Sequence, residues 1–255
     1  MPRLVRVAVD GTPIWGVVEG DDVFELVGDP FGEARAGARI DSLTQFRLLA
    51  PVVPSKIVCV GRNYPAHAAE HGSEVPAEPL LFFKPPSSVI GPDEAIVLPR
   101  QSNRVEHECE LAVVMGRRCK DVSPADAWEY VLGVTCGNDV TARDLQRSDN
   151  QWTRAKGFDT FCPVGPWVLA GVSAADVAQW NVSCRVNGDL RQQGNVGEMA
   201  FSPAELIAYT SSIMTLEPGD LILTGTPAGV GPLVDGDLVE VEVEGVGVLA
   251  NPVTG

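Results

Sequence analysis

Three carboxylates in this chain have the types and spacing of a cation site. Glu108 and Glu110 flank Cys109 at the start of an apolar, β-branched run that ends at Met115, and Asp139 lies further along the chain. Side chains two positions apart on a strand point to the same face, so Glu108 and Glu110 are expected to project together, with Asp139 as a third oxygen arm. On a buried face these like charges must raise a pKa or hold a cation, because an unpaired buried carboxylate is costly.

A set of carboxylates without histidine or cysteine favours hard cations. Mg²⁺ or Mn²⁺ is expected first, Ca²⁺ next and Zn²⁺ last. The alternative is a half-exposed strand with Glu108 and Glu110 in solvent and Cys109 inward, because alternation of polar and apolar residues is the ordinary pattern of such a strand. The local pattern leaves both interpretations open.

A histidine and a glutamate form the second candidate group. Pro65 can open a short helix, and His67 and Glu70 then share one face of it. At this spacing the carboxylate can orient the imidazole and raise its basicity, as a general base that activates water requires. The alternative is a pair on the exposed face of a surface helix.

One lysine and one glycine-rich turn complete the candidates. Lys156 lies among aromatic and small residues, where its charge could neutralise a developing enolate or a substrate carboxylate. The alternative is a surface lysine whose aliphatic stem packs on apolar neighbours. The turn from Thr224 to Gly231 matches neither the dinucleotide fingerprint nor the phosphate loop, but its backbone amides could hold a carboxylate.

Strands must position most of these groups. Residues 3–27 alternate apolar and polar around tight turns, which predicts a small β appendage over residues 1–50, followed by a catalytic domain over residues 51–255. The boundary lies near residue 50, where prolines precede the buried-strand pattern of Ile57 to Val60.

Helix signals are few. Ser123-Pro124 and Ser202-Pro203 mark two helix starts, and apolar residues from Leu206 to Met214, Ile213 among them, follow the second at helical spacing. Asn187-Gly188 predicts a hairpin, and residues 238–244 alternate strictly as a strand. The expected class is therefore α+β, dominated by sheet, without regular βαβ alternation.

Composition excludes several classes of protein. The formal net charge of −15 disfavours nucleic acid and anionic membrane partners, and no run of about 18 apolar residues predicts a membrane span. No signal peptide is evident, so a cytoplasmic location is expected. The six cysteines lack metal-finger spacing and lie in strand-like segments, which predicts buried free thiols.

In combination and order, these segments resemble the fumarylacetoacetate hydrolase superfamily, in its shorter branch. The resemblance covers about residues 54 to 252 and rests on segments that occur in the family's order. They are Gly61 to Tyr64, Glu108 with Glu110, Asn138 to Asp144, Trp152 to Lys156, Val186 to Gly188 and Thr224 to Gly231.

The resemblance implies a mixed β-sandwich roll, a homodimer and a divalent metal, with Mg²⁺ foremost. It assigns the metal to Glu108, Glu110 and Asp139, and the catalytic roles to His67 and Glu70 on a lid helix and to Lys156. It also implies that a set of polar residues lines or orients the substrate. These are Arg62, Arg143, Gln146 and Thr226.

The implied chemistry passes through an enolate of a 2-oxo acid that the cation stabilises. Carbon–carbon hydrolysis of an acylpyruvate is the first hypothesis, with His67 and Glu70 deprotonating the attacking water. The alternatives are isomerisation of a 2-hydroxy-diene-dioate from aromatic catabolism, decarboxylation of oxaloacetate, and a non-catalytic dicarboxylate binder. The short segment between Asp144 and Trp152 borders the expected pocket and leaves substrate size open.

Overall fold

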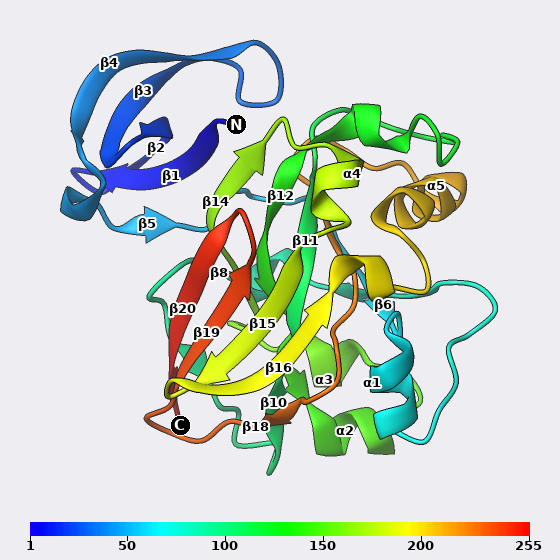
Figure 1. Ribbon diagram of the computed structural model, residues 1–255. Helices are drawn as coiled ribbons and strands as arrows, with labels where there is room; N and C mark the ends of the chain where they lie inside the picture. The colour runs from blue at the N-terminus through cyan, green and yellow to red at the C-terminus, as the bar shows by residue number, and fades with distance from the viewer.

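The computed structural model describes all 255 residues, and strands dominate it (Figure 1). Its largest sheet contains 12 strands, and β11 lies near the middle of it, between β12 and β17. Residues of β11 alternate between two hydrophobic clusters, so the strand is buried on both faces. The strands of this sheet beyond the N-terminal segment are β6 (Ile57–Gly61), β7 (Leu80–Lys84), β8 (Val89–Ile90), β11 (Cys109–Met115), β12 (Val131–Asn138), β14 (Cys162–Ala170) and β17 (Leu221–Leu223).

The N-terminal segment forms a lobe of strands at the upper left of Figure 1 and continues the large sheet. Strand β1 pairs antiparallel with β14, with Arg3 opposite Leu169 and Leu4 opposite Val168. Leu4 also belongs to the same buried cluster as Val168, so this lobe shares hydrophobic core with the rest of the chain. Its strands are β1 (Arg3–Val9), β2 (Thr12–Glu19), β3 (Asp22–Gly28), β4 (Ala34–Ser42) and β5 (Leu48–Leu49), with a 3₁₀ turn at Leu43–Gln45.

A five-stranded sheet packs against the large one, and a small three-stranded sheet adjoins the site described below. The hairpin between β15 and β16 turns at Asn187 and Gly188, both with positive φ, as the sequence predicts. The five strands are β9 (Ile96–Val97), β15 (Asn181–Val186), β16 (Asp189–Asn195), β19 (Leu238–Val243) and β20 (Gly247–Thr254); the three are β10 (Val105–His107), β13 (Thr141–Ala142) and β18 (Gly231–Pro232).

The helices are short, and three of them, α1, α2 and α3, lie at the lower right of Figure 1. None is long and apolar enough to cross a membrane. The helices are α1 (Pro65–Glu70), α2 (Arg143–Ser148), α3 (Thr153–Lys156), α4 (Ala174–Val177) and α5 (Pro203–Ile213), and further 3₁₀ turns span Pro86–Ser88, Ala127–Tyr130 and Val196–Glu198.

Helix α5 begins as the sequence predicts. Ser202 and Glu205 form a reciprocal capping box, and Pro203 occupies the first turn. Of the apolar residues that follow at helical spacing, Leu206 and Ile207 are buried, whereas Ile213, the last residue of the helix, is 54% exposed.

The helix expected after Ser123 is absent. Ser123 Oγ donates to Asp126 Oδ2 at 2.7 Å, which closes a local turn, and only a 3₁₀ turn over Ala127–Tyr130 follows. Strand β12 then begins at Val131 and leaves no room for further helical turns.

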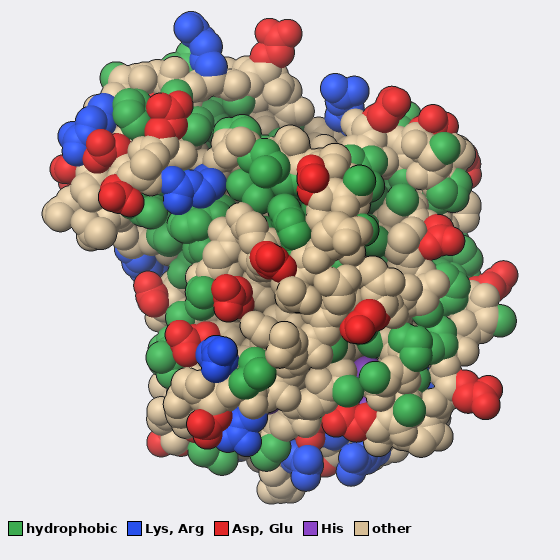
Figure 2. All heavy atoms as spheres, viewed as in Figure 1, with side chains coloured by type: hydrophobic (Ala, Val, Ile, Leu, Met, Phe, Trp, Pro, Cys, Tyr) green, Lys and Arg blue, Asp and Glu red, His purple; other side chains and the backbone are tan.

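The broad predictions of class are confirmed. The fold is α+β and sheet-dominated, with added N-terminal strands, and all six cysteines are buried free thiols. Acidic and basic side chains are interspersed on the face seen in Figure 2, without a broad basic area on that face.

Candidate active site and metal centre

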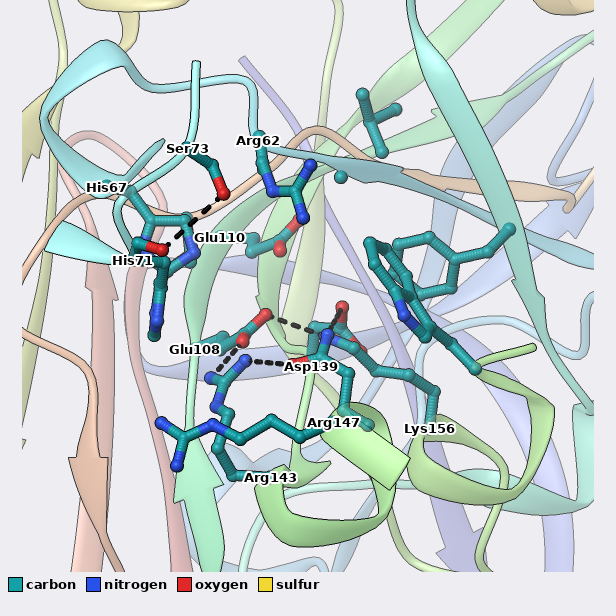
Figure 3. A pocket seen from close by; sticks show the side chains of 16 residues that line it. Arg62, His67, His71, Ser73, Glu108, Glu110, Asp139, Arg143, Arg147 and Lys156 are labelled. Atoms are coloured by element: carbon teal, nitrogen blue, oxygen red, sulfur yellow. Dashed lines mark hydrogen bonds and ion pairs between the residues drawn. The ribbon is translucent and has the colours of Figure 1, made fainter. Parts of the chain in front are cut away.

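The three carboxylates of Glu108, Glu110 and Asp139 converge. Oxygens from all three lie within 4.8 Å of one another. Each side chain is buried, so Glu108 and Glu110 do not lie on the solvated face of a half-exposed strand. Figure 3 shows the cluster in the pocket that it lines.

Pairing of β11 with β12 brings the carboxylates together. Cys109 lies opposite Asn138, and the next residue, Asp139, donates its backbone N–H to the carbonyl of Glu108 at 2.9 Å. The side-chain oxygen of Asn138 in turn accepts the N–H of Glu108 at 3.0 Å. One main-chain bond and one side-chain bond therefore hold Glu108 in register with Asn138 and Asp139.

Two of the carboxylates meet buried cations. Lys156 Nζ donates to Asp139 Oδ2 at 2.6 Å and to Glu108 Oε2 at 2.8 Å, and Lys84 Nζ lies 2.8 Å from Asp139 Oδ1. Arg143 bonds Glu108 and also donates to Glu106 Oε2 at 2.6 Å. Lys156 is thus a buried charge rather than a surface lysine.

These contacts set the protonation states. Burial opposes ionisation of Glu108, but Lys156 and Arg143 outweigh it and hold the pKa of Glu108 below its usual range. Burial likewise works against the charge of Lys156, yet Asp139 and Glu108 raise the pKa of this ammonium. Both side chains are therefore charged at neutral pH.

Glu110 has no cationic side chain within ion-pair distance. Its Oε2 accepts the backbone N–H of Gly225 at 2.6 Å, and burial, followed by the charges of Asp139 and Glu108, raises the pKa of Glu110 well above its usual range. Gly225 has φ +102°, and a Cβ there would lie 2.7 Å from Asn63 Cβ, so glycine is required at this turn.

The donor set fits a hard divalent cation. Three carboxylates with oxygens within 4.8 Å can share one ion, and Glu110 contributes buried oxygens that form no ion pair with a lysine or arginine. Glu108, Glu110 and Asp139 are the residues that would hold it.

His67 and Glu70 lie on α1, beside this cluster. His67 is buried, whereas Glu70 is exposed, and His67 Nδ1 lies 3.4 Å from Glu70 Oε2. Burial lowers the pKa of His67, so its imidazole is neutral at neutral pH. Glu70 also accepts the backbone N–H of Gly229, at 3.2 Å to Oε1. The backbone amides of the glycine-rich turn therefore bind carboxylates of the protein itself, those of Glu110 and Glu70.

A pocket of about 240 Å³ joins these groups, and most of its lining is polar. Arg62, Gln146 and Thr226 all line it, as do His67, Lys156 and the three carboxylates. Gln146 accepts from Arg143 at 2.5 Å, and Thr226 Oγ1 donates to the carbonyl of Cys109 at 2.9 Å. Arg62 makes no ion pair and no side-chain hydrogen bond within the protein, so its guanidinium is available to a ligand.

Sequence reasoning missed three residues of this region. Lys84 is buried beside Asp139. Its only signal in the local sequence is its position at the end of an apolar strand. Gln192 is also buried, where it bonds His107 and Thr226, although it lies in a polar hairpin strand. Arg147 lines the pocket without an acidic partner, and its place one turn of helix after Arg143 could have indicated it.

Comparison with known proteins identifies the family. The model described as fumarylacetoacetate (FAA) hydrolase C-terminal matches residues 56–254, and a second, described as Rv2993c-like, N-terminal, matches residues 3–51. The chain belongs to the fumarylacetoacetate hydrolase family. The resemblance stated from the sequence motifs is confirmed, and members of the family are enzymes that act on small molecules.

Individual relatives in the fumarylacetoacetate hydrolase family are similar over most of the chain. Protein Rv2993c of Mycobacterium tuberculosis is 51% identical over 90% of this chain and 86% of its own length. The human mitochondrial oxaloacetate tautomerase FAHD2A is 46% identical over 82% of this chain and 70% of its own. Among solved structures, the crystal structure of 5-carboxymethyl-2-hydroxymuconate delta-isomerase from Mycobacterium smegmatis superposes with a TM-score of 0.92 and covers 99% of both chains. The two sequences are 45% identical.

Proposed function

We propose that this protein is a divalent-metal-dependent enzyme that moves a proton on a small 2-oxo acid through its enolate. The convergence of Glu108, Glu110 and Asp139 with a buried ammonium and a neutral imidazole in one pocket carries the proposal. A cation bound by the carboxylates would polarise the carboxylate and keto oxygens of a 2-oxo acid, which is the chemistry that makes the adjacent carbon acidic.

Lys156 stabilises negative charge in this scheme. Its ammonium is buried and held by two carboxylates, so it is preorganised before substrate arrives. A fixed positive charge in a site that excludes water stabilises a developing enolate more strongly than solvent does. Lys156 stays protonated throughout, because Asp139 and Glu108 raise its pKa.

His67 is the base. Its Nδ1 faces Glu70, which leaves Nε2 to take a proton from the carbon next to the ketone. The same nitrogen then returns the proton, to the enolate oxygen in a tautomerisation or to a different carbon in an isomerisation. Neither reaction consumes water or needs a further reactant.

The pocket favours a small acid with two carboxylates. Its volume of about 240 Å³ lies below the usual range for drug-sized ligands, of roughly 300 Å³ upward. Arg62 and Arg147 line it without acidic partners, and a planar guanidinium binds a carboxylate in a fork. Relatives named oxaloacetate tautomerase and carboxymethyl-hydroxymuconate isomerase support both the proton transfer and the dicarboxylate.

Carbon–carbon hydrolysis of an acylpyruvate, which the sequence motifs put first, is the second candidate. The exposure of Glu70 beside buried His67 favours it, because a pair at the border of solvent can admit and activate a water. Decarboxylation of oxaloacetate would use the same enolate. A homodimer and a cytoplasmic location complete the proposal as sequence-based predictions.

The test uses magnesium-loaded protein with oxaloacetate, acetylpyruvate and 2-hydroxyhepta-2,4-diene-1,7-dioate as substrates. Ultraviolet bands follow the enol and diene, and pyruvate and carbon dioxide are assayed separately. Accelerated tautomerisation or a shifted diene band without pyruvate supports proton transfer. Formation of pyruvate from acetylpyruvate would instead identify a hydrolase, and release of carbon dioxide from oxaloacetate would identify a decarboxylase. The absence of any reaction with all three substrates would contradict the proposal.

A further inference from the structure

A second group of metal-ligating side chains lies on α1 and its C-terminal cap. His67, Glu70 and His71 have ligand atoms that all lie within 4.8 Å of one another. The two histidines are four residues apart in the order His-Ala-Ala-Glu-His, a spacing that places both imidazoles on one face of a helical turn. Pairs of histidines at this spacing are a recurrent way to chelate zinc.

The distances within this group resemble those between the ligands of one ion. His67 Nδ1 and Glu70 Oε2 are 3.4 Å apart, long for a hydrogen bond. Ligands at about 2.0–2.1 Å from a tetrahedral zinc are themselves roughly 3.4 Å apart. The imidazole centroids of His67 and His71 lie 4.7 Å apart with an interplanar angle of 81°, so the rings do not stack face to face.

One donor atom in the group has no partner. His71 Nε2 is buried and makes no hydrogen bond. A buried polar atom of this kind requires a partner, and a metal ion supplies one to the ring lone pair. Glu70 adds negative charge, since it meets no lysine or arginine and accepts only from the N–H of Gly229 and the imidazole of His67.

The donor classes separate this group from the carboxylate cluster. Two imidazoles and one carboxylate suit Zn²⁺, whereas three carboxylates suit Mg²⁺, Mn²⁺ or Ca²⁺. His67 and His71 lie side by side at the left of Figure 3. Both histidines also line the pocket, so an ion here can keep an open position toward solvent or substrate.

We propose that His67, Glu70 and His71 form a second, inhibitory binding site for Zn²⁺. Zinc bound there takes the lone pair of His67 Nδ1 and the carboxylate of Glu70. The ring proton then lies on Nε2, so this nitrogen can no longer take a proton from the substrate. The inhibitory effect rests on the proposed function, whereas the binding of zinc does not.

Cobalt reports the site directly, because Co²⁺ in a four-coordinate nitrogen site absorbs visible light far more strongly than in an octahedral oxygen site. Metal-free protein carrying Glu110→Gln, which weakens the carboxylate centre, is titrated with Co²⁺. An intense visible band that zinc displaces and that disappears when His71→Asn is added supports the proposal. A weak band only, or one that survives His71→Asn, overturns it.

Two further variants distinguish the loss of a metal ligand from misfolding of the protein. Glu70→Gln changes an exposed ligand and is expected to weaken the cobalt band as His71→Asn does. Glu74→Gln removes an exposed carboxylate of the same loop that lies outside the group, and is expected to leave the band unchanged. An unchanged band with Glu70→Gln, or an equal loss with Glu74→Gln, contradicts the assignment.

Inhibition is measured at saturating Mg²⁺, with each variant compared with its own zinc-free rate. His71→Asn is expected to raise the zinc concentration for half-inhibition by at least about tenfold, because a ligand is lost. Equal inhibition of the parent and His71→Asn proteins overturns the inhibitory role. If no substrate turns over, the proposed function fails, while the cobalt titration still decides the zinc site.

Discussion

Glu110 accepts the backbone N–H of Gly225 at 2.6 Å and meets no lysine or arginine, although its two carboxylate neighbours do. The buried oxygens of Glu110 therefore face the charges of Asp139 and Glu108, and only one hydrogen bond and the charge of Lys156, which makes no ion pair with Glu110, compensate for them. This imbalance favours either a proton or a bound cation on Glu110, because an unpaired buried carboxylate charge is costly.

The substitution Glu110→Gln tests this relationship. It removes one metal ligand and one carboxylate that is costly to ionise in its buried place, so Mg²⁺ affinity and activity should both fall by at least about tenfold, while the metal-free protein should become no less stable. Calorimetric titration with Mg²⁺ and thermal unfolding in chelator measure the two effects. The exposed Glu242→Gln on β19 is the matched control. Unchanged magnesium affinity in Glu110→Gln would remove this residue from the metal centre.

Lys84 positions the site without lining the pocket. Its Nζ donates to the carbonyls of Val140 at 3.0 Å and Lys156 at 2.5 Å, and it neutralises Asp139. Lys84→Met should destabilise the chelator-treated protein by about 3–5 kcal/mol, because Asp139 loses a buried partner. Added Mg²⁺ should restore part of that loss, since the ion supplies positive charge. Thermal unfolding with and without Mg²⁺ measures both, and equal melting temperatures for Lys84→Met and the parent in chelator would contradict the role of Lys84.

The pH dependence of activity should report His67. Burial lowers the pKa of His67 below its ordinary 6.5, and a base must be neutral, so kcat/KM should fall only as pH drops below about 6.5. Glu70 raises this pKa, so Glu70→Gln should move the acid limb to still lower pH. The dependence of kcat/KM on pH, measured in zinc-free buffer, gives the pH at which activity falls on the acid side. A limb above pH 6.5, or an upward shift in Glu70→Gln, would show that another group titrates.

The N-terminal lobe should unfold together with the rest of the chain. Leu4 on β1 is buried in one cluster with Val168 of β14, and the two residues are paired across the strands. Leu4→Ala should cost about 2–5 kcal/mol and lower a single cooperative transition. Calorimetry that shows two transitions, with only the smaller one moved, would instead make residues 1–50 an independently folding domain.

The carboxylate cluster could be predicted because its geometry is local. Glu108 directly precedes β11 and Glu110 is its second residue, while Asp139 directly follows Asn138, the last residue of the paired strand β12. The helix start at Ser202 could be predicted for the same reason, because its capping box spans only four residues. The similar signal at Ser123 failed because β12, which the local sequence does not place, begins at Val131.

The buried residues that contact the site residues without lining the pocket could not be predicted. Lys84 contacts Asp139 and the carbonyl of Lys156 only through the packing of distant segments. Gln192 reaches His107 across sheets in the same way. No pattern of period two or 3.6 encodes such contacts, because they depend on tertiary placement.

Exchange of deuterium into the carbon next to the ketone of a 2-oxo acid tests the central claim most directly. The measurement is made by nuclear magnetic resonance in D₂O, with magnesium-loaded protein, chelator-treated protein and the His67→Asn variant. The account predicts rapid exchange for the loaded protein and loss of it in the other two. Exchange that persists at the same rate in chelator, or in His67→Asn, would contradict it.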